Sequence, residues 1–224
     1  MQRKIQVVGW TLIWSGVFIF AYVAWQLYGT DLLNARVQDQ ASEDLDELFE
    51  AADPPPAIEI VPDNSPPGTD PLEHYPEDDP PAGEGFAMLT VPSLGLEAVV
   101  FEGVDRDTLT KGPGHMPGTP LPGQPGNAVI SGHRTTYGRP FHDFDLLQPG
   151  DLIEVETSIG THVYEVRETQ IVQPTDVWVT DDRGGGWLTL TTCNPKYSAR
   201  ERLIVFAELV SGPNAAYIDY LNQI

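Results

Sequence analysis

The sequence predicts a mainly β domain, folded as a barrel or a sandwich, behind a single membrane-spanning helix and a solvated linker. Three observations support this prediction. An uncharged apolar run occupies the N-terminus, an acidic proline-rich stretch follows it, and from residue 86 onward short apolar runs alternate with Gly and Pro. Many short strands separated by turn residues are typical of antiparallel barrels and sandwiches. The predicted boundaries are 1–30, 31–85 and 86–224.

The first element is the apolar run from Val7 to Leu27, which contains no charged residue. As a helix it would reach about 31 Å, close to the hydrocarbon thickness of a bilayer. Arg3 and Lys4 precede the run and acids follow it. The positive-inside rule therefore places the N-terminus in the cytoplasm and the rest of the chain outside, as a single-pass protein of the plasma membrane. A cleaved signal sequence is the alternative, and it also places the bulk of the protein outside the cytoplasm.

The second element is an acidic linker over residues 31–85. Of the 33 acids in the chain, 16 lie between Asp31 and Glu84, where Arg36 is the only base. Residues 31–50 show some helical periodicity, which would extend the anchor helix briefly. Residues 51–85 combine repeated prolines with few large apolar residues, so they are predicted to form a stiff, disordered stalk. The net charge of −21 argues against a nucleic-acid partner.

The third element, residues 86–224, carries the predicted strands. SIG at 158–160 predicts a hairpin turn, residues 104–114 one short helix, 141–147 a helical turn, and the C-terminal tail another short helix. No phosphate-binding loop or metal-ligand helix is present in the sequence. The predicted strands are 86–91, 96–101, 127–133, 151–157, 161–172, 187–193 and 202–209.

Three residue types that catalyse acyl transfer stand at ends of these strands. His133 closes one strand, Cys193 closes a second and Arg202 opens a third. Cys193 is the only cysteine, which excludes an internal disulfide or a multi-cysteine metal site. It leaves an inert buried thiol, an intermolecular bridge or a nucleophile. An imidazole can exchange the protons of a thiol and a leaving amine, and a guanidinium can stabilise the oxyanion of a tetrahedral intermediate.

The sequence resembles the sortase family. Thr189-Leu190-Thr191-Thr192-Cys193 matches the family's Thr-Leu-x-Thr-Cys pattern at a strand end, His133 in SGHR matches the upstream histidine, and Arg202 matches the downstream arginine. The resemblance covers about residues 86–210. The longer stretches around His133 and Cys193 are most similar to class E, with class D as the neighbouring class.

This resemblance implies a closed sortase-type β-barrel of about eight strands with short helices, and cysteine transpeptidation without a cofactor or metal. Cys193 would attack the Thr–Gly bond of a C-terminal sorting signal on a secreted protein, and His133 would move the protons. Arg202 would stabilise the oxyanion, Thr192 would support the oxyanion or the peptide backbone, and Tyr137 would contact the signal. The acceptor would be an amine of a peptidoglycan precursor. Class E members are similar in preferring Leu-Ala-x-Thr-Gly to Leu-Pro-x-Thr-Gly.

Two other functions remain open on the sequence. A cysteine peptidase would share the thioacyl step and use water as the acceptor. A membrane-tethered domain that binds wall components without catalysis would keep Cys193 buried and inert. Transfer to an added amine separates the first alternative from a transpeptidase, and resistance of the thiol to alkylation would favour the second.

Overall fold

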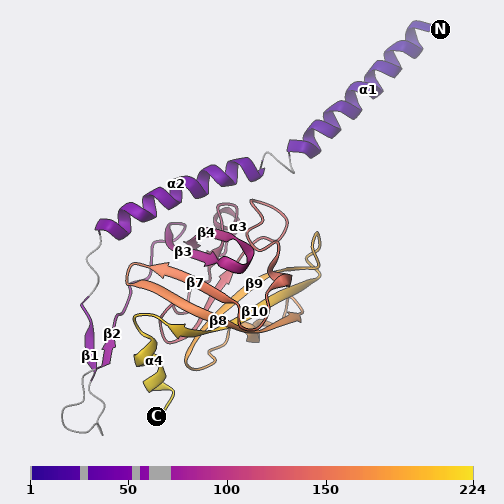
Figure 1. Ribbon diagram of the computed structural model, residues 1–224. Helices are drawn as coiled ribbons and strands as arrows, with labels where there is room; N and C mark the ends of the chain where they lie inside the picture. The colour runs from indigo at the N-terminus through magenta and orange to yellow at the C-terminus, as the bar shows by residue number, and fades with distance from the viewer. Residues whose placement is uncertain (1, 26–29, 52–55, 61–71, 224) are drawn as a thin grey trace, which may run out of the picture.

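The computed structural model describes residues 2–25, 30–51, 56–60 and 72–223, and a closed barrel of eight strands lies at its centre (Figure 1). Around the barrel the strands follow the order β10-β8-β7-β3-β4-β5-β6-β9, and β9 pairs with β10 to close it. The closed barrel that the sequence predicts is therefore confirmed. Its strands are β3 (Gly85–Val91), β4 (Leu96–Glu102), β5 (Gly114–His115), β6 (Gly126–Ser131), β7 (Leu152–Thr157), β8 (Gly160–Val172), β9 (Gly186–Asn194) and β10 (Glu201–Ser211).

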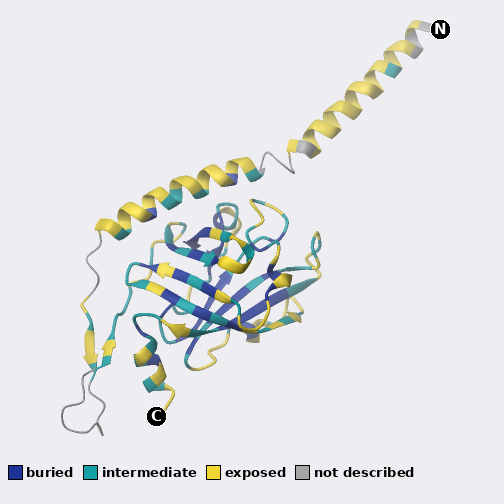
Figure 2. Cartoon of the chain, viewed as in Figure 1, coloured by how far each residue is buried: buried dark blue, intermediate teal, exposed yellow. Residues whose placement is uncertain are grey.

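Alternating side chains fill the barrel. In β7, Ile153 and Val155 are buried while Leu152 is exposed, and β8 buries Tyr164 and Val166 in the same way. This period of two is what a strand with one face on the core requires. The predicted hairpin is confirmed, because Thr157 of β7 pairs with Gly160 of β8. Figure 2 shows the buried residues concentrated in the barrel strands.

Two strand pairs differ from the antiparallel pattern that the sequence suggested. β4 runs parallel to β5, and β6 runs parallel to β9, while the other pairs of the barrel are antiparallel. Parallel neighbours need a long connection, and the β7–β8 hairpin lies within the one that joins β6 to β9. The two-residue strand β5 is too short to leave a periodic signal in the sequence, so only seven strands were predicted.

Short helices fill the connections. Helix α3 (Arg106–Leu109) begins at Asp105, whose carboxylate accepts from the N–H groups of Asp107 and Thr108. This is an ordinary N-cap. The other short helices are η2 (Pro92–Leu94), η3 (Phe144–Leu146), η4 (Val177–Thr180) and α4 (Ala215–Leu221). Three of them, α3, η3 and α4, lie where the sequence predicts helices.

Helix α1 (Gln2–Ala24) extends away from the barrel (Figure 1). Its segment Gln6–Val23 has a mean hydropathy of 1.6 and no buried part, so by length and composition it is a candidate membrane span. A signal sequence near an N-terminus has the same properties.

The next helix differs from the expected solvated linker. Helix α2 (Thr30–Ala51) lies along the barrel, next to β3 and β4. The Gln38 amide donates to the Val99 carbonyl at 3.3 Å and accepts from the Val99 N–H at 2.7 Å. Further along, Leu45 is 2% exposed and packs against Val99 and Phe101. Helix α2 is therefore part of the folded domain.

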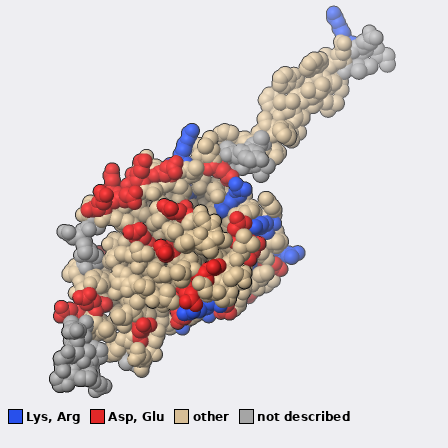
Figure 3. All heavy atoms as spheres, viewed as in Figure 1, with Lys and Arg blue, Asp and Glu red and all other residues tan. Residues whose placement is uncertain are grey.

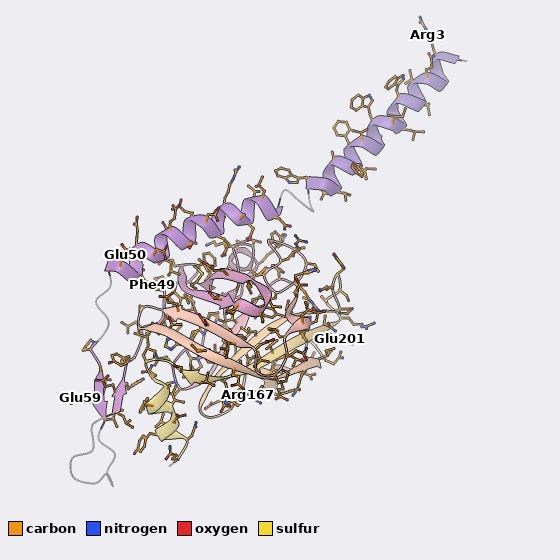
Figure 4. The ribbon with its side chains drawn as sticks, viewed as in Figure 1. Arg3, Phe49, Glu50, Glu59, Arg167 and Glu201 are labelled. Atoms are coloured by element: carbon orange, nitrogen blue, oxygen red, sulfur yellow. The ribbon has the colours of Figure 1, made fainter. Side chains whose placement is uncertain are left out.

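The composition of α2 concealed this docking. Its inward stripe is formed by Asn34, Gln38, Ala41, Leu45 and Phe49, spaced as one face of a helix. Two of the five are amides that bond to backbone groups, so the stripe lacks a strong hydrophobic pattern. The acids after Asp31 are exposed on the outer face, where Figure 3 shows a row of acidic side chains. Figure 4 shows Phe49 near the end of the helix, beside the barrel.

The C-terminal part of the expected linker is also attached. Strands β1 (Ile58–Ile60) and β2 (Leu72–His74) pair with each other. The side chain of Asn214 then bonds both backbone groups of Tyr75, at 2.7 and 3.0 Å. Residues 52–55 and 61–71 of the expected linker lie outside the described residues.

Candidate active site

Cys193 and Arg202 come together through one antiparallel pair. Cys193 is near the end of β9, Arg202 is near the start of β10, and the two are direct partners in the register. Directly opposed residues carry their side chains on the same face of a sheet, with Cβ atoms about 4.5–5.5 Å apart. The turn between the strands therefore returns the arginine to the cysteine.

His133 reaches the same end of the barrel through the parallel pair. The register joins Ser131 of β6 to Thr191 of β9, and the Gly132 N–H donates to the Thr191 carbonyl at 3.0 Å. His133 lies two residues past Ser131, and Cys193 lies two residues past Thr191. His133, Cys193 and Arg202 consequently line one groove of about 220 Å³.

The remaining walls of this groove combine apolar and polar side chains. Val104, Leu109 and Met116 make its apolar side, while Thr191 and Thr192 add polar groups. Cys193 is only partly buried, and it lines the groove. Among the residues that the structure describes, no three His, Cys, Asp or Glu side chains gather as metal ligands would.

The groove contains two basic side chains, His133 and Arg202. Burial lowers the pKa of His133 below its ordinary value, because the imidazolium form loses solvation. The imidazole is therefore neutral at neutral pH and able to accept a proton. Nη1 of Arg202 donates to the Ala199 and Glu201 carbonyls, both at 3.0 Å. Among the described residues, its Nε and Nη2 have no protein partner, which leaves two donors for a bound ligand.

Thr192 and Tyr137, the two predicted substrate contacts, differ in their placement. Thr192 lines the groove, but its hydroxyl donates to the Gly132 carbonyl at 2.7 Å and so ties β9 to the segment that carries His133. Tyr137 stands beside His133, with ring centroids 5.1 Å apart. It lines a second pocket, of about 270 Å³, together with residues of α2 rather than with Cys193.

Arg134, directly after His133, is a further residue of this region. Its side chain is 3% exposed, and its Nη1 donates to the Cys193 carbonyl at 3.2 Å and to Asn194 Oδ1 at 2.6 Å. Its Nη2 pairs with Asp145 at 2.9 Å, and Asn194 in turn donates to Glu201. The chain neighbours of His133, Cys193 and Arg202 are thus joined in one polar network. The only sequence signal was an arginine directly after the histidine.

Comparisons with known proteins agree with this arrangement. Residues 89–210 match the Sortase domain family. The chain is similar to Sortase SrtE1 of Streptomyces coelicolor, with 29% identity over 92% of this chain and 57% of the relative, so it spans little more than half of that protein. It is also similar to Sortase D of Bacillus subtilis, with 34% identity over 59% of this chain and 67% of the relative.

A solved structure extends the likeness to three dimensions. The crystal structure of Sortase E1 from Streptomyces coelicolor with a tripeptide in the active site superposes with a TM-score of 0.55 at 31% identity. The match covers 60% of this chain and 97% of that structure. The barrel fold is therefore shared with a solved structure of this family.

Proposed function

This chain belongs to the sortase family of cysteine transpeptidases, and from that premise we propose that Cys193 is its nucleophile, acting on a C-terminal sorting signal. The observation that carries the proposal is the convergence of His133, Cys193 and Arg202 on one groove from three strand ends. The tripeptide in the active site of the Streptomyces coelicolor relative supports a peptide as the occupant.

In the first half of the reaction, His133 accepts the proton of the Cys193 thiol as sulfur attacks the carbonyl carbon of the signal's threonine. The C–S bond forms, and the carbonyl oxygen becomes an oxyanion to which Arg202 donates. The imidazolium then gives its proton to the glycine nitrogen as the C–N bond breaks. A thioacyl enzyme and a free amine result.

In the second half, an acceptor amine attacks the thioester and loses a proton to His133. The C–S bond breaks, the departing sulfur takes the proton back, and a new amide is released. The proposed acceptor is an amine of a peptidoglycan precursor. With an apolar N-terminal helix as the anchor, the N-terminus would lie in the cytoplasm and the catalytic domain outside the plasma membrane.

The resemblance to class E and class D sortases implies a Leu-Ala-x-Thr-Gly or Leu-Pro-x-Thr-Gly signal as the substrate. The test incubates the full-length protein, in detergent, with each peptide and an added amine, and reads the products by mass. We expect cleavage between Thr and Gly with an amine-linked product, and none with Cys193→Ala.

The main competing function is a cysteine peptidase, because the partly exposed thiol leaves the groove open to water. The same experiment decides between the two. Hydrolysed peptide alone, at every amine concentration, would overturn transfer while leaving the nucleophile in place. His133→Ala should lower turnover by about 10²-fold or more, the usual scale for losing an acid–base group.

A further inference from the structure

The turn that follows His133 contains three consecutive residues in the left-handed region. Tyr137 has φ 52°, Gly138 φ 74° and Arg139 φ 54°. Glycine adopts this conformation freely, but tyrosine and arginine do so at a cost in free energy. Such residues persist where the surrounding structure holds them, and they concentrate at functional sites.

The surrounding structure here is the first turn of α2. Asp31 Oδ1 accepts from the Gly138 N–H at 3.1 Å, and Asp31 Oδ2 pairs with Arg139 Nη2 at 3.2 Å. The ion pair is partly exposed and contributes little by itself. The carboxylate nevertheless fixes two adjacent residues of the strained turn at once.

Asn34, one helical turn further on, supports the same contact. A Cβ on Gly138 would come within 2.1 Å of Asn34 Oδ1, so the turn lies directly against this side chain. The Asn34 amide in turn donates to the carbonyls of Thr110 and Lys111, at 2.9 and 2.8 Å. Helix α2, the turn and the loop after α3 are therefore packed as one unit.

The turn is connected to the groove through Tyr137. Its ring lies 5.1 Å from the His133 ring, with an angle of 40° between the planes. The other titratable or charged groups that line the groove around His133 are Cys193 and Arg202. Removing the tyrosine ring from this place would expose the imidazole and free its rotation.

We propose that Asp31 and Asn34 of α2 are positioning residues for the reaction, which hold the turn 137–139 so that Tyr137 keeps His133 in its place in the groove. The inference rests on the proposed function. It assigns a role in the active site to a helix outside the barrel, next to the candidate membrane span. The far end of α2 is attached separately, through Leu45.

The test compares Asp31→Ala with Asp46→Ala in the full-length protein. Asp46 is an exposed acid of the same helix, so its removal matches the change in charge and helix composition. We expect Asp31→Ala to lower kcat by about 10-fold to 100-fold, the scale of a misplaced catalytic group, with KM within about twofold. Asp46→Ala should stay within about twofold for both constants.

A pH profile separates positioning from a general loss of stability. With the tyrosine ring displaced, His133 gains solvent, so the apparent pKa of the histidine limb in kcat should rise toward about 6.5 in Asp31→Ala. Tyr137→Ala should give the same rise, and Tyr137→Phe, which keeps the ring, should not. The double variant Asp31→Ala/Tyr137→Ala should lose no more kcat than Tyr137→Ala alone, because the two act in series.

Asp31→Glu, which retains a carboxylate, should recover most of the activity. If Asp31→Ala does not fold, Asp31→Asn and Gly138→Ala are measured in its place. The inference is overturned by wild-type kcat and pH profile in these variants, or by additive losses in the double variant. Neither of these results bears on the proposed function, which falls if Cys193→Ala still transfers the peptide or if the wild-type protein only hydrolyses it.

Discussion

Cys193 of β9 and Arg202 of β10 face each other directly across an antiparallel strand pair. The backbone pairing fixes the two positions opposite each other, and both side chains line the same groove. Under the proposed function, Arg202 would be a donor already in place before a substrate enters, which is the condition for strong oxyanion stabilisation.

The first prediction concerns Arg202. Arg202→Ala should lower kcat by about 10²-fold or more, because the oxyanion loses its donors. Arg202→Lys should recover only part of this, since an ammonium lacks the planar fork of donors. Peptide turnover measures both. The matched control is Arg167→Ala. Arg167 lies on the outer face of the barrel, where it pairs with Glu165 and Glu208, and Figure 4 labels it. Full activity in Arg202→Ala would remove this role.

Arg134 is predicted to matter for both folding and turnover. Arg134→Gln leaves the Cys193 carbonyl without its buried charged donor, while the half-exposed Asp145 keeps Lys196 as a partner. The expected cost is about 2 kcal/mol in the free energy of unfolding. Turnover should fall as well, because the backbone of Cys193 loses its support. Urea unfolding and peptide turnover measure the two effects. Arg200→Gln, at a side chain 74% exposed, should change neither.

The Thr192 hydroxyl has two candidate roles, a structural hydrogen bond to Gly132 and a contact with the substrate. Thr192→Val removes the donor to the partly buried Gly132 carbonyl and should lower the free energy of unfolding by about 0.5–1.5 kcal/mol. Thr192→Ser keeps the donor and should preserve most of that stability. If Thr192→Val instead retains its stability and loses kcat, the hydroxyl acts on the substrate rather than on the strand.

Because α2 packs against the barrel, Leu45 and Leu48 of this helix should contribute differently to the free energy of unfolding. Leu45→Ala should lower the free energy of unfolding by about 2–4 kcal/mol, because this side chain is 2% exposed. Leu48→Ala, at 49% exposed, should change it by less than about 0.5 kcal/mol. Thermal or urea unfolding of the full-length variants measures both. Equal effects would contradict a docked helix.

The buried side chain of His162 should make the protein less stable in acid. Burial lowers its pKa from 6.5 to about 4. Between these values the unfolded chain binds a proton that the folded protein does not, so stability is fully present above pH 6.5 and decreases as the pH falls. The loss down to pH 4 is on the order of 3 kcal/mol.

His162→Gln should remove this contribution, and the difference in unfolding free energy between wild type and variant, from pH 7 to 4.5, measures it. Glu77 contributes with the opposite sign, because burial raises the pKa of its carboxyl. It is present in both proteins, so it largely cancels in the difference. Identical pH slopes in wild type and variant would count against the buried, neutral histidine.

Most of the barrel was predictable because its signals are local. The alternation in residues 151–172 indicates two strands and their hairpin, and both lie where expected. The placement of His133, Cys193 and Arg202 at strand ends follows from the same pattern. Strand β5 and the parallel pairs were missed, since pairing direction depends on which distant strands become neighbours.

The sequence by itself determined the apolar N-terminal helix, seven of the barrel strands and the residues that could carry acyl transfer, because periodicity and motif are properties of adjacent residues. Only the tertiary structure decided that α2 belongs to the domain and that Asp31 reaches the turn beside His133. The physical reason is that Asn34 and Gln38 bind backbone carbonyls and N–H groups, which every sequence offers. Contacts of that kind leave no hydrophobic pattern, so they become visible only once the chain has folded.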